Sequence, residues 1–316
     1  AWCGIAWDPI SLVLARFVQG LGGGIASAVV LGMIAGLYAE PRERLRAFAV
    51  LAFVGSIGAS VGTVLGGVLT DVASWRWAFL INVPFGIIAL IVALRAVEGT
   101  PPTGAKGGLL PRGLFAQRRF TLANLILLTL TFGGFTFQFV TTLYLQDVLG
   151  FGALSTGLAF LPVTVVIAIA TLGFSATLAE RFGSERVLLV GVLAFVAGMV
   201  YLVRIPEAGG FPLDVLPGAV VMALGFGLAM PQVTALAMGA LAPEHAGIGS
   251  GLTTTTQQLG GFLGTLIAAG LVTTVGYGAA YASAAIALAT GAAVAAYLLV
   301  DAARARDPKV SERVPD

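Results

Sequence analysis

The amino-acid sequence predicts an all-α protein that crosses a lipid bilayer many times, and three observations carry this prediction. Hydrophobic residues make up 58% of the 316 residues and charged residues only 10%, against a usual charged share of about 25%. The apolar residues form runs of bilayer length separated by short charged segments. The 43 glycines lie largely inside these runs. A water-soluble globule could not cover its surface with so few charges.

The number of crossings follows from the number of apolar runs that reach bilayer length. A spanning helix needs about twenty mostly apolar residues. Helices are expected because backbone polar groups in lipid must be paired within the segment, and the alternation of a β-barrel strand is absent. The nine runs that meet this length are 10–37, 47–69, 78–96, 122–145, 154–178, 187–203, 213–238, 247–275 and 279–299.

Basic residues indicate the orientation of these spans. The loops on one side hold fourteen Lys and Arg, whereas the loops on the other hold only Arg76 and Arg204. Because cytoplasmic loops carry the basic excess, we expect a cell-membrane protein with a cytoplasmic C-terminus. The fourteen residues are Arg42, Arg44, Arg46, Arg95, Lys106, Arg112, Arg118, Arg119, Arg181, Arg186, Arg304, Arg306, Lys309 and Arg313.

A segment rich in Gly, Pro and basic residues, at 98–119, divides the chain. We expect residues 1–97 to be the remainder of an N-terminal bundle (three helices plus a partial one) and 98–119 to be a cytoplasmic linker. Residues 120–300 would form a six-helix bundle and 301–316 a cytoplasmic tail. The opening AWCGIAW is too short to cross a bilayer and lacks the features of a signal peptide. We interpret it as the tail of an earlier helix, and three preceding helices would give twelve.

The polar chemistry of the chain excludes several kinds of site. One cysteine, Cys3, excludes an intrachain disulfide framework, and with the single His245 it leaves no soft-metal cluster. We expect no cofactor, no metal and no nucleic-acid partner. No Asp or Glu lies deep in an expected span, so no intramembrane carboxylate is visible as a proton carrier.

Arg16 lies inside the first expected span, in SLVLARFVQGLGGG. A guanidinium in a bilayer costs between ~2.5 and over ~10 kcal/mol, depending on the reference state, so it needs a wet cavity or a partner. It either tunes a proton or substrate site or snorkels toward the outer end. Gln19 shares nearly the same face, and Gly20 begins a glycine run suited to close packing.

Two further patterns mark candidate positions. Gly58, Gly62 and Gly66 recur every fourth residue, with Gly67 beside them, which favours either a moving helix interface or static packing. Amides next to aromatic or Met side chains indicate either a cavity for bulky amphiphiles or a packed or lipid-facing surface. These residues are Phe135, Gln138, Phe139, Phe226, Met230, Gln257 and Gln258.

Several stretches resemble the major facilitator superfamily. LVLARFVQGLGGG resembles its fourth-helix motif at Arg16, Gln19 and Gly20, and the glycine stripe resembles its fifth-helix antiporter motif, G-x-x-x-G-P-x-x-G-G. SWRWAFLINVPFG, LFAQRRF, LYLQDVLGFGALSTGLAFLP and LAERFGSERV resemble the multidrug:proton antiporter group with fourteen helices. The likeness covers essentially the whole chain. Thr63 replaces the motif proline, and the extra mid-chain helix pair is missing.

The resemblance implies a two-bundle secondary transporter, expected to be a monomer, that exports small amphiphilic compounds against protons. It implies proton coupling at Arg16 and a sealing interface at the glycine stripe. It also implies a cytoplasmic gating loop, which is formed by Glu180, Arg181, Gly183 and Arg186. We expect that the 316-residue chain alone does not transport, because nine helices leave one half incomplete.

Two alternatives stay open. One is a non-transporting sensor or scaffold of the same fold. The other is an intramembrane enzyme, which we disfavour because His245 lies on a loop with no partner.

Overall fold

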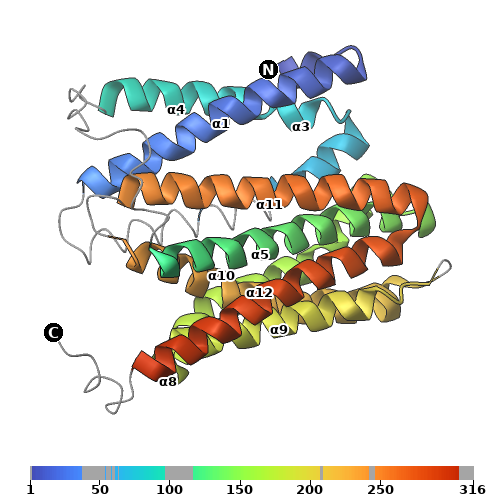
Figure 1. The fold of residues 1–316 in the computed structure, drawn as a ribbon. Coiled ribbons are helices and arrows are strands. Elements are labelled where there is room, and N and C mark those ends of the chain that lie inside the picture. Colours follow the sequence, from blue (N-terminus) through green and yellow to red (C-terminus); the bar gives the residue numbers. More distant parts are fainter. Residues whose placement is uncertain are drawn as a thin grey trace. The chain divides into compact units, whose positions relative to one another are not determined.

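The structure, a computed structural model, describes residues 2–37, 54, 58, 61–62, 64–96, 117–206, 209–241 and 246–305. Every regular element in these ranges is a helix, which confirms the all-α prediction (Figure 1). Most of the predicted linker at 98–119, the basic loop around Arg44, His245 and most of the predicted tail lie outside the described residues. The linker was predicted to end too late, because Arg118 and Arg119 already form the first turn of the next helix.

The chain forms two compact units, which are described separately. Unit 1 comprises Ala1–Pro111 and Phe151–Phe160, and unit 2 comprises Arg112–Gly150 and Leu161–Asp316. The chain therefore returns to unit 1 for one short segment after it has entered unit 2.

Unit 1 begins with a short 3-10 helix, η1, that leads into the long helix α1. Asp8 caps α1, since its Oδ1 accepts a hydrogen bond from the backbone N–H of Ser11 at 2.6 Å, and Pro9 opens the helix, where no N–H is needed. The described part of a further helix covers 64–72. The elements of unit 1 are η1 (Trp2–Ile5), α1 (Pro9–Leu37), α3 (Trp77–Leu80), α4 (Asn82–Ala96) and α6 (Ala153–Ala159).

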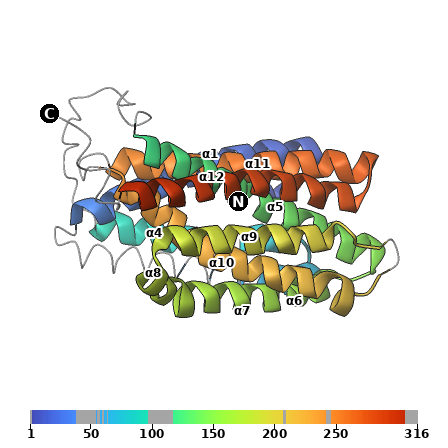
Figure 2. The ribbon, with the colours of Figure 1, turned by 60° about the horizontal axis from the view of Figure 1, so that its bottom comes forward.

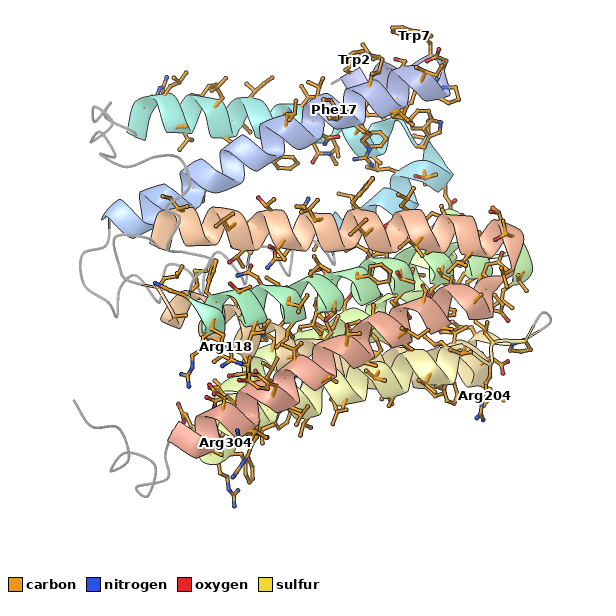
Figure 3. The ribbon with its side chains drawn as sticks, in the orientation of Figure 1. Trp2, Trp7, Phe17, Arg118, Arg204 and Arg304 are labelled. Atoms are coloured by element: carbon orange, nitrogen blue, oxygen red, sulfur yellow. The ribbon has the colours of Figure 1, made fainter. Side chains whose placement is uncertain are left out.

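The four tryptophans of the chain lie at the start of unit 1's helices. Trp2 and Trp7 flank the start of α1 (Figure 3), and Trp75 and Trp77 lie at the start of α3, which packs against η1. The Arg76 guanidinium donates to the Ala6 carbonyl at 3.1 Å. Tryptophan is enriched at membrane–water interfaces, so this end of the unit suits the bilayer boundary.

Unit 2 is a bundle of long helices that run side by side (Figures 1 and 2). Helix α5 packs against α10, α11 and α12, and α9 packs against α10 and α12. Of its three π-helical turns, η2 follows α5, η3 lies between α7 and α8, and η4 precedes α10. The elements are α5 (Arg118–Leu143), η2 (Tyr144–Val148), α7 (Leu161–Ile169), η3 (Ala170–Ser175), α8 (Ala176–Phe182), α9 (Ser184–Leu202), η4 (Phe211–Val215), α10 (Leu216–Gly239), α11 (Ala246–Thr274) and α12 (Tyr277–Ala305).

Glycines set the closest helix contacts of unit 2. A Cβ on Gly198 would lie 2.5 Å from the backbone nitrogen of Met222, and one on Gly225 would collide with that of Phe195. Helices α9 and α10 therefore approach each other through backbone rather than side chains. Gly260 and Gly264 bring α11 equally close to the α5 carbonyls.

The expected spans agree with the helices of the described residues. Six segments are long and apolar enough to cross a membrane: Trp77–Arg95, Arg118–Val148, Ala153–Phe182, Ser184–Leu202, Phe211–Gly239 and Tyr277–Arg304. Two other expected spans correspond to α1 and α11, with 29 residues each. The expected span at 47–69 is described only in part.

Charged residues separate to the two ends of unit 2, as the basic pattern predicted. Arg118 at the start of α5 and Arg304 near the end of α12 lie at one end, whereas Arg204 after α9 lies at the other (Figure 3).

Candidate functional site

The first candidate cluster surrounds Arg16 in unit 1. Helix α1 places Arg16 and Gln19 on one face, and Arg16 Nη1 donates to Gln19 Oε1 at 3.3 Å. The guanidinium also lies over the ring of Phe79 from α3, 4.5 Å from its centroid. Among the described residues its partners are thus an amide and an aromatic face rather than a carboxylate. Hydrogen bonding and cation–π attraction thus hold the Arg16 guanidinium in place.

Gln19 connects this cluster to a small recess. Its Oε1 also accepts a hydrogen bond from the Cys3 thiol at 3.3 Å. The recess has a volume of about 230 Å³ and is lined by Trp2, Cys3, Ala15, Val18, Gln19, Phe79, Asn82 and Val83. The sequence indicated Cys3 only as a residue too isolated for a disulfide or a soft-metal cluster. Phe79 was not predicted, because no helical spacing relates a residue on α3 to one on α1.

The glycine stripe divides into open and crowded positions. Added Cβ atoms on Gly58, Gly62 and Gly66, and likewise on Gly20 of α1, would meet no described atom within 4 Å. A Cβ on Gly67 would lie 2.8 Å from the Ala153 carbonyl oxygen of α6. The stripe therefore approaches another helix at Gly67, and its other members leave a smooth face uncovered in unit 1.

Asp71, one turn beyond the stripe, holds the start of α6. Its Oδ2 accepts a hydrogen bond from the backbone N–H of Leu154 at 3.0 Å. A helix start leaves such N–H groups unpaired, so a carboxylate from another helix serves as the cap. The sequence indicated Asp71 only as a residue at a span end.

Aromatic and amide side chains on α5 and α11 form the second candidate cluster, in unit 2. Phe135 is 49% exposed, and its ring rests on α11, where a Cβ on Gly261 would lie 2.9 Å from it. Gln138 and Gln258 are exposed and Gln257 is half-buried. Gln138 lies three residues after Phe135 on α5, and Gln257 and Gln258 lie four and three residues before Gly261 on α11. Since a helix rises about 1.5 Å per residue, the amides lie about 5 Å from this contact along the helix axes, Gln138 on one side and Gln257 and Gln258 on the other.

Three other predicted cavity residues are less exposed than Phe135. Phe226 is half-buried, and its ring meets that of Phe195 edge-on, at 5.8 Å between centroids and 86° between planes. Met230 and Phe139 are also half-buried. Phe135, Gln138 and Gln258 are therefore the exposed members of the predicted set.

The predicted gating loop joins α8 to α9 at the end of unit 2 that carries Arg304. Gly183, between the two helices, has a φ of +91° and a ψ of +142°, a conformation that favours glycine. Glu180, Arg181 and Arg186 are exposed. A recess of about 440 Å³ opens beside Gly183, and its other lining residues are Arg119, Ala179, Ser184, Glu185, Ala235, Leu236, Gly239 and Ala240.

A buried polar cluster in unit 2 was not predicted. Gln232 Nε2 donates to Ser175 Oγ at 2.9 Å and to the Ser175 carbonyl at 3.1 Å. Gln232 is 5% exposed and Ser175 is fully buried. Gln232 lies inside the expected span 213–238, but no periodicity pairs it with a serine 57 residues earlier.

The sequence of the chain matches a known protein family. The model of the Major Facilitator Superfamily matches residues 1–265. The chain belongs to the major facilitator superfamily. Membership accounts for the helical membrane architecture and confirms the resemblance seen in the motifs.

Several curated proteins are similar to this chain. EfpA of Mycobacterium tuberculosis, described as an uncharacterized MFS-type transporter, is 32% identical, over 82% of this chain and 59% of the relative. The puromycin resistance protein of Streptomyces alboniger is 29% identical, over 83% of this chain and 63% of the relative. The cephamycin export protein of Amycolatopsis lactamdurans is 26% identical, over 87% and 68%. The chain thus spans about three fifths of the first two relatives.

Proposed function

We propose that the protein is a secondary transporter that exports small amphiphilic, drug-like compounds in exchange for protons. The observation that carries the proposal is the family match together with relatives that are named for resistance to, or export of, antibiotics. The clusters on the two units supply chemistry that fits this activity. We further propose that it acts as a monomer in the cell membrane, with the C-terminus in the cytoplasm.

The cluster on α5 and α11 fits an amphiphile. Phe135 offers an aromatic face for an apolar ring, and Gln138 and Gln258 offer uncharged donors and acceptors at either side of it. A site of this kind binds by area and flexible packing rather than by one fixed ion pair, which suits ligands of varied structure.

Arg16 is the residue that we propose for proton coupling. A guanidinium that contacts a neutral amide and a ring interacts strongly with any further charge in a medium of low dielectric constant. A proton or cationic substrate entering nearby changes the energy of that charge, and the protein responds by shifting between inward-open and outward-open states. The glycine stripe would then act at the moving interface and the loop 180–186 at the cytoplasmic closure.

The experiment uses protein expressed from its complete gene and reconstituted in liposomes, with a fluorescent cationic dye and an imposed pH gradient. Arg16→Ala is expected to lower proton-driven dye transport at least tenfold, about 1.4 kcal/mol or more in the barrier, while equilibrium dye binding persists. Arg16→Lys, which keeps the charge but not the planar contact with Phe79, should be intermediate.

Arg95→Ala, at the end of α4, is the matched control and should leave transport unchanged. Unaltered pH-driven transport by Arg16→Ala would remove the coupling role. Dye movement that is independent of the pH gradient in the unmodified protein would remove proton exchange altogether.

A further inference from the structure

Two irregular helical segments of unit 2 lie against each other. One is the π-helical turn η3 between α7 and α8, and the other surrounds Pro231 inside α10. Helix α10 packs against both α7 and η3. π-helical turns and internal prolines both interrupt the regular hydrogen-bond ladder of a helix and are recognised causes of bends.

A side chain on η3 replaces the hydrogen bond that Pro231 removes from α10. Pro231 has no N–H, so the carbonyl of Gly227, four residues earlier, loses its helical donor. Thr171 Oγ1 donates to that carbonyl at 3.1 Å. Gly227 permits this approach, because a Cβ there would lie 2.8 Å from the Ile167 carbonyl oxygen. A hydroxyl from η3 thus takes the place of the missing N–H of α10.

Gln232 on α10 bonds in turn to Ser175, the last residue of η3. The Gln232 amide donates to both the carbonyl and the hydroxyl oxygen of Ser175. The Ser175 hydroxyl in turn donates to the Leu228 carbonyl at 3.1 Å. A buried carboxamide without partners is costly in an apolar setting, so these bonds resist separation of the two segments.

We propose that Thr171, Ser175 and Gln232 form a polar tie that makes η3 and the Pro231 segment of α10 bend as one hinge. Opening either segment alone would leave the Gly227 carbonyl or the Gln232 amide unpaired. Movement that keeps the bonds requires both segments to bend together. The tie does not rest on the proposed transport function, because it follows from contacts within unit 2.

Hydrogen exchange of the purified protein in lipid nanodiscs tests the tie, with peptides that cover 167–176 and 227–235. Thr171→Val and Gln232→Leu should each accelerate exchange roughly three- to tenfold, the factor for one or two modest hydrogen bonds. Both segments should accelerate by the same factor, whichever helix carries the substitution. Thr171→Ser keeps the donor and should retain the original exchange, which separates the lost bond from misfolding.

Two further variants complete the test. Thr234→Val removes a hydroxyl that bonds only within α10, to the Met230 carbonyl at 2.9 Å, and should leave 167–176 unchanged. Pro231→Ala restores the N–H, so Thr171→Val should have little effect in that background. Acceleration confined to the substituted helix, or an equal effect of Thr171→Val with and without Pro231, overturns the proposal.

Discussion

At the scale of single residues, Phe135 keeps an exposed position because a glycine on the neighbouring helix supports it. One face of its ring lies on the α11 backbone at Gly261, and about half of the side chain stays uncovered. A ring that is fixed on one side and open on the other can stack on an apolar ligand without losing rotamer freedom on binding. This is the physical argument for the proposal that Phe135 contacts the substrate.

We therefore expect Phe135→Ala to raise the KM for dye export about three- to tenfold with a smaller effect on kcat, the range for one lost aromatic contact. Leu125→Ala is the matched control, because Leu125 is on the same helix, is 46% exposed and points in a different direction. Initial rates over a range of dye concentrations separate the two parameters. A KM for Phe135→Ala equal to that of Leu125→Ala would contradict the assignment.

The environment of Arg16 shows what could be predicted at this scale. The spacing of three between Arg16 and Gln19 predicted a shared face, and the two side chains are bonded. Phe79 completes the cluster from α3, and a spacing rule within one helix cannot identify a partner on another. The same holds for Ser175 and Gln232. Helical periodicity identifies faces, whereas tertiary packing decides which faces meet.

At the scale of elements, glycine fixes the crossing of α9 and α10. Gly191 and Gly198 on one helix and Gly218 and Gly225 on the other are each seven residues apart, a spacing that keeps them on one seam. The sequence contained this spacing, but only the structure shows that the two seams face each other. The expected spans were easier to predict because bilayer thickness alone sets their length. The turn η3 left no such signal.

Gly225→Ala is expected to destabilise unit 2 by about 1–3 kcal/mol, because the added Cβ would collide with the Phe195 backbone and α9 must move. Thermal unfolding in detergent measures this change. Gly270→Ala on α11 adds a Cβ in open space and should be neutral or slightly stabilising, since Ala is the better helix former. Equal melting temperatures for the two variants would show that the contact is less tight than described.

Gly66 and Gly67 are adjacent, but substitution by Ala should have an effect only at Gly67. An added Cβ at 67 would press on the Ala153 carbonyl oxygen and weaken the bond between Asp71 and the Leu154 N–H, whereas one at 66 meets open space. Gly67→Ala should therefore accelerate hydrogen exchange of 151–160 roughly fivefold, and Gly66→Ala should not. Asp71→Asn, which keeps an acceptor, should lie between them. Identical exchange in the two glycine variants would mean that the stripe does not hold α6.

At the scale of the whole molecule, the chain links its two units more than once. It leaves unit 1 near Pro111, returns for Phe151–Phe160 and continues directly into α7 of unit 2. Helix α6 is therefore anchored in one unit by Asp71 and joined covalently to the other at Leu161. Because the segment that holds α6 is joined to unit 2 at both ends, a movement of one unit against the other must bend the chain at Gly150–Phe151 and at Phe160–Leu161, or release α6. The glycine at 67 and the cap at 71 thus act on a connection between units.

The orientation that we propose, with the C-terminus in the cytoplasm, is argued from the separation of Arg118 and Arg304 from Arg204 in unit 2, because cationic loops are retained in the cytoplasm. In a background from which every cysteine has been removed, Cys3 included, Arg204→Cys should react with a membrane-impermeant maleimide in intact cells. Arg118→Cys and Arg304→Cys should react only after the cells are permeabilised, since both lie at the opposite end of the bundle. Labelling of Arg304→Cys in intact cells would reverse the orientation, and equal labelling of all three sites would exclude a bundle that spans the bilayer from end to end.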